Sequence, residues 1–107
     1  MREVKMSDGR GNNPSLEVLL SLLGGPMHGY AIADDIESRT GQRPGPGTLY
    51  GAISRLEERG LIAAAPAQDR RRPYRITRAG IDAAREELGQ MQATVRVGLR
   101  RLRAATS

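Results

Sequence analysis

The chain has 107 residues, with 17 Lys and Arg against 12 Asp and Glu, which gives a formal net charge of +5. That length suits one domain with one modest core, and the absence of cysteine excludes disulfides, thiolate zinc sites and cysteine nucleophiles. A single histidine leaves no partner for a histidine-based metal cluster, and no apolar run is long enough to span a membrane. We expect a cytoplasmic protein without a cofactor or a metal.

The positive charge is concentrated in the last two-fifths of the chain. Residues 1–65 carry 7 basic and 8 acidic side chains, a net charge of −1, whereas residues 66–107 carry 10 basic and 4 acidic ones, a net charge of +6. All but one of the 17 basic residues are Arg. Arginine suits contacts with phosphate and guanine, although a coding bias would give the same count. A basic segment of this kind favours a nucleic acid as the partner.

The first helix follows a polar leader. Residues 1–13 have no apolar period, which predicts a disordered segment. Ser15 is the predicted N-cap of the helix, and Gly24-Gly25-Pro26 ends it. Leucines recur at the spacing of one helical face, at Leu16, Leu19, Leu20 and Leu23. Leu22 adds an apolar side chain on another side, so we expect this helix to be buried between other elements.

Two further helices follow, separated by a short loop. The second runs from about Gly29 to Arg39, and Gly41 is suited to a left-handed C-cap. Its inner face carries Ile32, Ala33 and Ile36. The third begins at Pro46, which is favoured in a first turn, and is closed by Gly60. Its inner face carries Leu49, Ala52, Ile53 and Leu56.

A hairpin and a long helix complete the chain. Short alternating segments at 61–65 and 74–77 flank the charged stretch 66–73, which predicts a β-hairpin with a projecting loop. Thr77 then caps a helix over 78–103, which would be ~39 Å long at 1.5 Å per residue. Because that is too long to pack on so small a domain, we expect its apolar seam to pair with a second copy. The dimerisation residues are Ile81, Leu88, Met91, Val95, Leu99 and Leu102.

The second and third helices form a helix-turn-helix, and the hairpin is its wing. The fold class is therefore mainly α (α+β), a winged helix-turn-helix with a two-stranded wing and a long C-terminal dimerisation helix. We expect a leader over 1–13, a DNA-binding domain over 14–77 and the dimerisation helix over 78–107. The exposed face of the third helix can approach a major groove, while the wing suits phosphates or a minor groove. The DNA-binding residues are Thr48, Ser54 and Arg55 on the helix and Arg70, Arg71, Arg72 and Arg75 in the wing.

Three blocks carry a family resemblance: LLSLLGGPMHGYAI at 19–32, GPGTLYGAISRLEERGLI at 45–62 and RRRPYRITRAG at 70–80. Together they resemble the PadR family of winged-helix transcriptional regulators. The matching features are a Gly-Tyr pair after the first helix, a Pro-Gly-Thr-Leu-Tyr start to the recognition helix and an Arg-rich wing. The resemblance covers about residues 15–82, and the short final segment is similar to the subgroup with a single C-terminal helix.

The resemblance implies a homodimer that binds inverted-repeat operators in double-stranded DNA, usually as a repressor. It also implies that the hydroxyl of Tyr50 contacts a phosphate. We expect Tyr30 to pack against the first and third helices, with a phosphate contact as the alternative. His28 should lie at the start of the second helix, and Tyr74 should be half packed under the wing. Relatives that hold flat aromatic drugs between subunits use aromatic side chains, which the last helix lacks, so no small-molecule effector is identified.

Two other classes of function compete with a DNA-binding regulator. A winged-helix protein–protein interaction module would use the long C-terminal helix as its partner surface. Its DNA binding would show no preferred sequence and would vanish by ~150 mM salt. An enzyme is disfavoured, because the available carboxylates fit exposed helix faces without an apolar loop pocket around them. Those carboxylates are Asp34, Asp35, Glu57 and Glu58.

Overall fold

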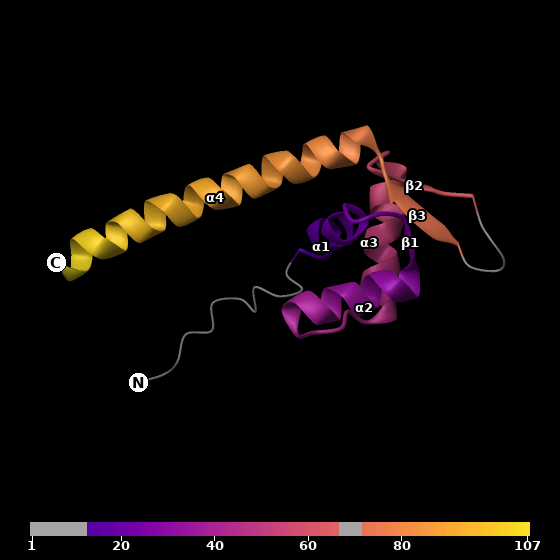
Figure 1. Ribbon diagram of the computed structural model, residues 1–107, viewed down its shortest axis with the longest axis horizontal. Coiled ribbons are helices and arrows are strands. Elements are labelled where there is room, and N and C mark those ends of the chain that lie inside the picture. Colours follow the sequence, from indigo (N-terminus) through magenta and orange to yellow (C-terminus); the bar gives the residue numbers. More distant parts are fainter. Residues whose placement is uncertain (1–12, 67–71) are drawn as a thin grey trace.

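The computed structural model describes residues 13–66 and 72–107. Within these residues the elements are α1 (Pro14–Leu22), β1 (Met27–His28), α2 (Gly29–Thr40), α3 (Pro46–Glu58), β2 (Ile62–Ala64), β3 (Pro73–Ile76) and α4 (Arg78–Thr106) (Figure 1). The mainly helical winged helix-turn-helix is therefore confirmed, with each predicted helix and strand shifted at its ends by at most three residues. The leader predicted over 1–13 lies, apart from its last residue, outside the described residues.

Helix α1 lies at the centre of the domain and contacts α2, α3 and α4 (Figure 1). Leu16, Val18, Leu19 and Leu22 are buried, as expected for a helix enclosed on several sides. The predicted stripe is wrong at its end. The side chain of Leu23, the C-cap residue of α1, is 46% exposed.

The N-terminus of α1 is capped by Asn13 and not by Ser15. The Oδ1 atom of Asn13 accepts the backbone N–H of Leu16 at 3.0 Å. The helix starts two residues earlier than a Ser15 cap would place it, because Pro14 occupies its first position, where a missing N–H costs nothing. Ser15 therefore lies inside the first turn.

The sheet has three antiparallel strands in the order β1-β3-β2 among the described residues. Strand β1 was not predicted, because two residues are too few to show an alternating pattern. It places Met27 opposite Tyr74, beside the β2–β3 hairpin. His28 ends β1 and caps α2, where its Nδ1 accepts the N–H of Ala31 at 3.3 Å. The expected place of His28 at the start of α2 is confirmed.

One hydrophobic core joins the three short helices to the sheet and to the first turns of α4. Ile32, Ile53 and Ile62 are almost completely buried within it. Tyr74 is only 8% exposed, so it lies deeper under the wing than predicted. Ala84 is the last buried residue of α4, and the rest of this helix extends away from the domain (Figure 1).

A close contact fixes the start of α4 on the end of α3. The backbone N–H of Thr77 donates to the carbonyl of Leu61 at 3.0 Å, and its hydroxyl donates to the carbonyl of Gly60 at 2.7 Å. The same hydroxyl accepts the N–H of Gly80 at 3.1 Å, which confirms Thr77 as the N-cap. A Cβ on Gly80 would lie 2.1 Å from the carbonyl oxygen of Leu61, so only glycine permits this approach.

A polar network, absent from the sequence prediction, joins α1 to α2. The buried hydroxyl of Ser21 donates to Oδ2 of Asp35 at 2.7 Å, and Nε of Arg39 donates to the same oxygen at 2.9 Å. Nη1 of Arg39 also pairs with Oε1 of Glu17 at 2.6 Å. The bond from Ser21, followed by the bond from Arg39, holds the pKa of Asp35 below its ordinary value despite partial desolvation. The ionised carboxylate therefore stabilises the contact between the two helices.

The Asp35→Asn variant should lose this pH-dependent contribution. Because the pKa of Asp35 is lower in the folded state, its contribution is complete above about pH 4 and disappears as the pH falls through the folded pKa. We expect the variant to be less stable than the wild type by about 1 kcal/mol at neutral pH, with the difference shrinking toward about pH 2. Urea unfolding across this range, followed by circular dichroism, measures it.

The Asp82→Asn variant serves as the control, because Asp82 forms only exposed pairs on α4. Its stability should follow that of the wild type at every pH. A constant deficit of Asp35→Asn across the whole pH range would contradict the assignment.

Candidate nucleic-acid interface

The outer face of α3 consists of small and polar side chains. Thr48, Ser54 and Arg55 are exposed, and Gly51 lies between them on the same side of the helix. The N-cap residue Gly45 makes no side-chain bond to the first turn, so the first backbone N–H groups of α3 are left without a side-chain cap. Small side chains and open backbone N–H groups allow a duplex to approach this face closely.

The guanidinium of Arg55 lies back along α3. A Cβ on Gly51 would be 3.4 Å from Nη1 of Arg55, so the guanidinium lies beside the glycine one turn earlier. The two arginines near the end of α3, Arg55 and Arg59, are offset by Glu57 and Glu58. The helix is consequently close to neutral, as expected from the sequence.

Tyr50 packs against the start of α2 while keeping about half of its surface exposed. Its side chain is 49% exposed, and a Cβ on Gly29 would lie 2.3 Å from its Oη and 2.7 Å from its Cζ. The ring therefore rests on the bare backbone of Gly29. This contact holds the hydroxyl at the junction of α2 and α3, where a phosphate beside the recognition helix could reach it.

The wing contributes cations beside α3. Arg72 and Arg75 are exposed, and neither forms an ion pair with another residue in 13–66 or 72–107. Arg75 lies on β3 opposite Ala63 of β2, which places it on the hairpin itself. Arg70 and Arg71 lie outside the described residues.

The turn between α2 and α3 holds an aromatic–cation pair. Tyr30 is 66% exposed, so the prediction that it packs against α1 and α3 is wrong. The guanidinium carbon of Arg43 lies 4.8 Å from the centre of the Tyr30 ring instead. Nη1 of Arg43 also pairs with Asp34 at 2.5 Å and with Glu37 at 3.2 Å. The hydrogen bonds that Arg43 donates to Asp34, and then to Glu37, raise the pKa of Arg43 above its ordinary value.

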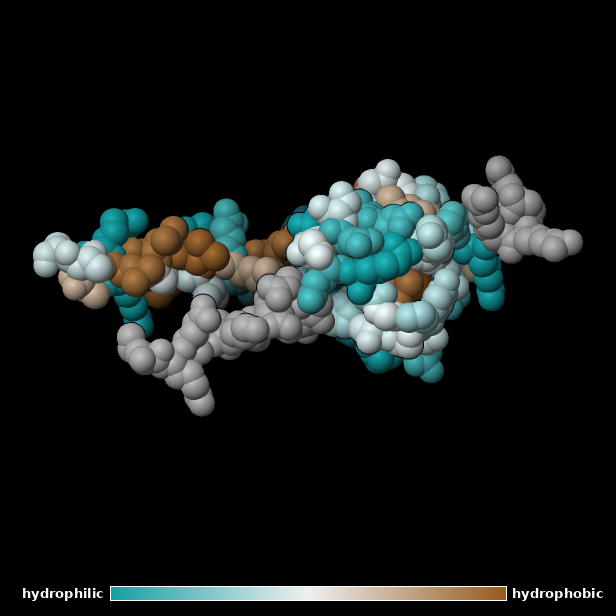
Figure 2. Space-filling model, turned by 90° about the horizontal axis from the view of Figure 1, so that it is seen from below, coloured by the Kyte–Doolittle hydropathy of each residue, from teal (hydrophilic) through white to brown (hydrophobic). Residues whose placement is uncertain are grey.

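The projecting part of α4 has an exposed apolar seam. Figure 2 shows apolar side chains along it, outside the domain. Five predicted dimerisation residues are 39–60% exposed, namely Leu88, Met91, Val95, Leu99 and Leu102. The sixth, Ile81, is half-buried at the domain end of the seam.

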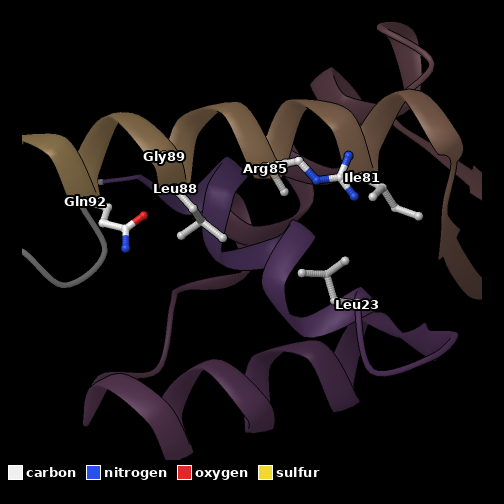
Figure 3. A pocket seen from close by; sticks show the side chains of 7 residues that line it. Leu23, Ile81, Arg85, Leu88, Gly89 and Gln92 are labelled. Carbon is white, nitrogen blue, oxygen red and sulfur yellow. The ribbon is translucent and has the colours of Figure 1, made fainter.

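A groove of about 560 Å³ continues this seam where α4 leaves the domain. It lies between the end of α1 and α4, with Leu23 on one wall and Ile81 and Leu88 on the other (Figure 3). Its lining is largely apolar, with Arg85 and Gln92 at the sides. The exposure of Leu23, which the sequence pattern did not predict, is explained by its place in this groove.

In residues 13–66 and 72–107, no group of three or more His, Cys, Asp or Glu side chains is placed to hold a metal ion. None of the helices in that part of the chain combines the length and apolarity needed to cross a bilayer.

Comparison with known proteins connects this geometry to one family. The family model described as "Transcriptional regulator PadR-like family" matches residues 18–86. A 37.1 kDa protein in transposon TN4556 of Streptomyces fradiae is 43% identical over 82 residues, which are 77% of this chain and 24% of that protein. The chain thus spans about a quarter of the length of this curated relative.

Two solved structures are similar over most of both chains. A transcriptional regulator from Clostridium thermocellum shares 31% identity and a TM-score of 0.75, covering 88% of this chain and 94% of its own. A PadR family transcriptional regulator from Eggerthella lenta shares 28% identity and a TM-score of 0.73, covering 89% of this chain and 85% of its own.

Replacing Gly29 by alanine should displace Tyr50 without unfolding the domain. The new methyl group would overlap the tyrosine ring, which can turn outward because it is half exposed. We expect a loss of about 1 kcal/mol in the free energy of unfolding, together with weaker DNA binding. Gly29→Ala and Tyr50→Ala should weaken binding equally, and the double variant should weaken it no further. Gly24→Ala is the control, because a Cβ there would meet only the carbonyl oxygen of Ser21 at an ordinary contact distance of 3.7 Å. Additive losses would rule out a shared cause.

Proposed function

The chain belongs to the PadR-like family of transcriptional regulators, and on that premise we propose that it is a sequence-specific repressor that binds an inverted-repeat operator in the cytoplasm as a homodimer. The family and the structural relatives identify a DNA-binding regulator. The observation that carries the finer proposal is the pairing of a near-neutral, small-residue recognition helix with exposed wing arginines.

In this proposal α3 reads the major groove and the wing holds the backbone. Thr48, Ser54 and Arg55 contact base edges, with Arg55 suited to guanine. Tyr50 donates its hydroxyl to a phosphate beside the groove. The wing arginines, with Arg70 and Arg71 among them, contact phosphates without selecting a sequence.

The dimer in this proposal forms through α4. At 1.5 Å per residue this 29-residue helix is about 43 Å long, and its apolar seam is exposed beyond Ala84. A second copy would cover the seam and the groove beside Leu23. The two recognition helices would then lie ~34–36 Å apart, in successive major grooves of one operator. No effector is proposed.

Selection of bound duplexes from a random pool tests the proposed function. The enriched sequence can then be used to separate the roles of α3 and the wing. The selected duplexes should show two-fold symmetry.

Arg72→Gln with Arg75→Gln should weaken binding to all duplexes and flatten the plot of log affinity against log salt by ~0.9 per lost phosphate contact. Ser54→Ala or Arg55→Gln should instead change which bases are preferred.

Arg101→Gln with Arg103→Gln removes the same charge from the far end of α4 and is the matched control for the wing variant. An unchanged salt dependence of the wing variant would make the wing assignment wrong. A pool without enriched sequences, with binding lost by ~150 mM salt, would favour the protein–protein interaction module.

The dimer assignment is tested by Val95→Glu with Leu99→Glu. Both side chains are more than half exposed, so the charges should leave the domain folded but separate the two copies. Sedimentation should report a monomer, and operator affinity should fall by ~100-fold because each half-site must then bind alone. The control is Val97→Glu, which lies about 200° around the helix from Val95 at 100° per residue. A dimer that survives the double change would exclude this seam as the interface.

A further inference from the structure

Arg43 is the cation next to the start of the recognition helix, and it is held by two carboxylates of α2. Both recorded ion pairs use the same nitrogen, Nη1, which approaches Asp34 at 2.5 Å and Glu37 at 3.2 Å. Tyr30 supports the guanidinium from beneath, at 4.8 Å from the ring centre. The charged cluster of Asp34, Glu37 and Arg43 therefore has one positive and two negative groups, a net charge of −1.

This cluster borders the surface assigned to DNA. Arg43 and Tyr30 line one hollow of about 400 Å³ together with Pro46 and Tyr50 of α3. At 0.1 M salt the Debye length is about 10 Å, so exposed charges closer than this are only partly screened from one another. A duplex whose phosphate reaches Tyr50 therefore lies within the field of the cluster.

The neighbouring cations are held differently. Arg72 and Arg75 make no ion pair within residues 13–66 and 72–107, and Arg55 lies along α3 beside Gly51. Among these arginines of the proposed DNA surface, Arg43 is thus the one whose charge is more than offset by adjacent carboxylates within residues 13–66 and 72–107. Neutralising the two carboxylates would leave the cluster with a charge of +1.

We propose that Asp34 and Glu37 act as an electrostatic brake on DNA binding, holding Arg43 away from the phosphate backbone at the turn before α3. The inference rests on the proposed function, because it requires that α3 and the wing face a duplex. The brake acts on phosphates and so is independent of sequence. It reduces the general attraction of the protein to DNA and leaves a larger share of the affinity to base contacts.

The Asp34→Asn, Glu37→Gln double variant tests the brake on a duplex unrelated to the operator. Both side chains are more than half exposed, so the fold should be retained, as circular dichroism can verify. We expect roughly three- to tenfold tighter binding near 0.1 M salt, and a salt dependence steeper by ~0.9 as Arg43 gains one phosphate contact.

The Asp82→Asn variant is the matched control, because this carboxylate likewise pairs with two arginines, Arg78 and Arg85, but lies on α4. It should bind the unrelated duplex like the wild type. Adding Arg43→Gln to the double variant should return the salt dependence to the wild-type slope, since the released cation is then absent.

The outcomes of these experiments distinguish a failure of the brake from a failure of the proposed DNA-binding function. The brake is overturned if the double variant binds the unrelated duplex no tighter than Asp82→Asn does. It is also overturned if the steeper salt dependence persists after Arg43→Gln is added. In either case, operator binding by the wild type would still support the proposed regulator. A wild type that binds neither the operator nor the unrelated duplex at low salt overturns both.

Discussion

The contact between Gly80 and the carbonyl of Leu61 sets the geometry on which the rest of the molecule depends. It brings the first turn of α4 against the chain leaving α3, and Thr77 locks it with bonds to both Leu61 and Gly60. The recognition helix, the wing and the long helix meet at this one point. Because a side chain at Gly80 would collide with backbone, which cannot move aside cheaply, the direction of α4 is tied to that of α3. In a dimer, the spacing of the two recognition helices would depend on this fixed angle together with the way the two α4 helices pair.

The charged side chains around α3 are paired differently near the helix and on the wing. Near α3 the basic and acidic side chains offset one another, and at the preceding turn Arg43 is outnumbered by Asp34 and Glu37. On the wing, Arg72 and Arg75 form no ion pair with another residue in 13–66 or 72–107. Since phosphate attraction carries no sequence information, this arrangement separates the groups that would select a base from those that would supply affinity. The same separation is visible in the sequence, where the whole chain has a net charge of +5 but the first 65 residues have a net charge of −1.

The fold was largely predictable, and the reasons for the errors are local. Helix periodicity placed α2, α3 and α4 because each has an apolar face several turns long, such as Leu49, Ala52, Ile53 and Leu56 on α3. Strand β1 escaped prediction because its two residues depend on pairing with β3. The cap of α1 was misassigned because Ser15 and Asn13 are both good capping residues, and only the position of Pro14 decides between them.

Part of the candidate site was also predictable from the sequence, and part of it was not. Thr48, Ser54, Arg55 and the wing arginines are visible in the sequence because they lie between apolar positions or cluster in a charged run. The support of Tyr50 by Gly29, the stacking of Arg43 on Tyr30 and the groove beside Leu23 join residues from different elements. No local pattern encodes them, because each depends on how different segments of the fold pack together.

By itself, the sequence determined the order of the four helices and the β2–β3 hairpin and the concentration of positive charge after residue 65, since composition and periodicity are local properties. The family resemblance came from the three matching blocks of sequence. Only the tertiary structure decided which arginines pair with carboxylates within residues 13–66 and 72–107, and which apolar side chains remain exposed. Arg43 and Arg75 are the same residue type, yet one is held by two carboxylates of a neighbouring helix and the other is exposed on a strand. The difference lies in the path of the backbone after α2, which folds back so that Arg43 meets carboxylates six and nine residues earlier. That path is not visible in the hydrophobic periodicity of the sequence.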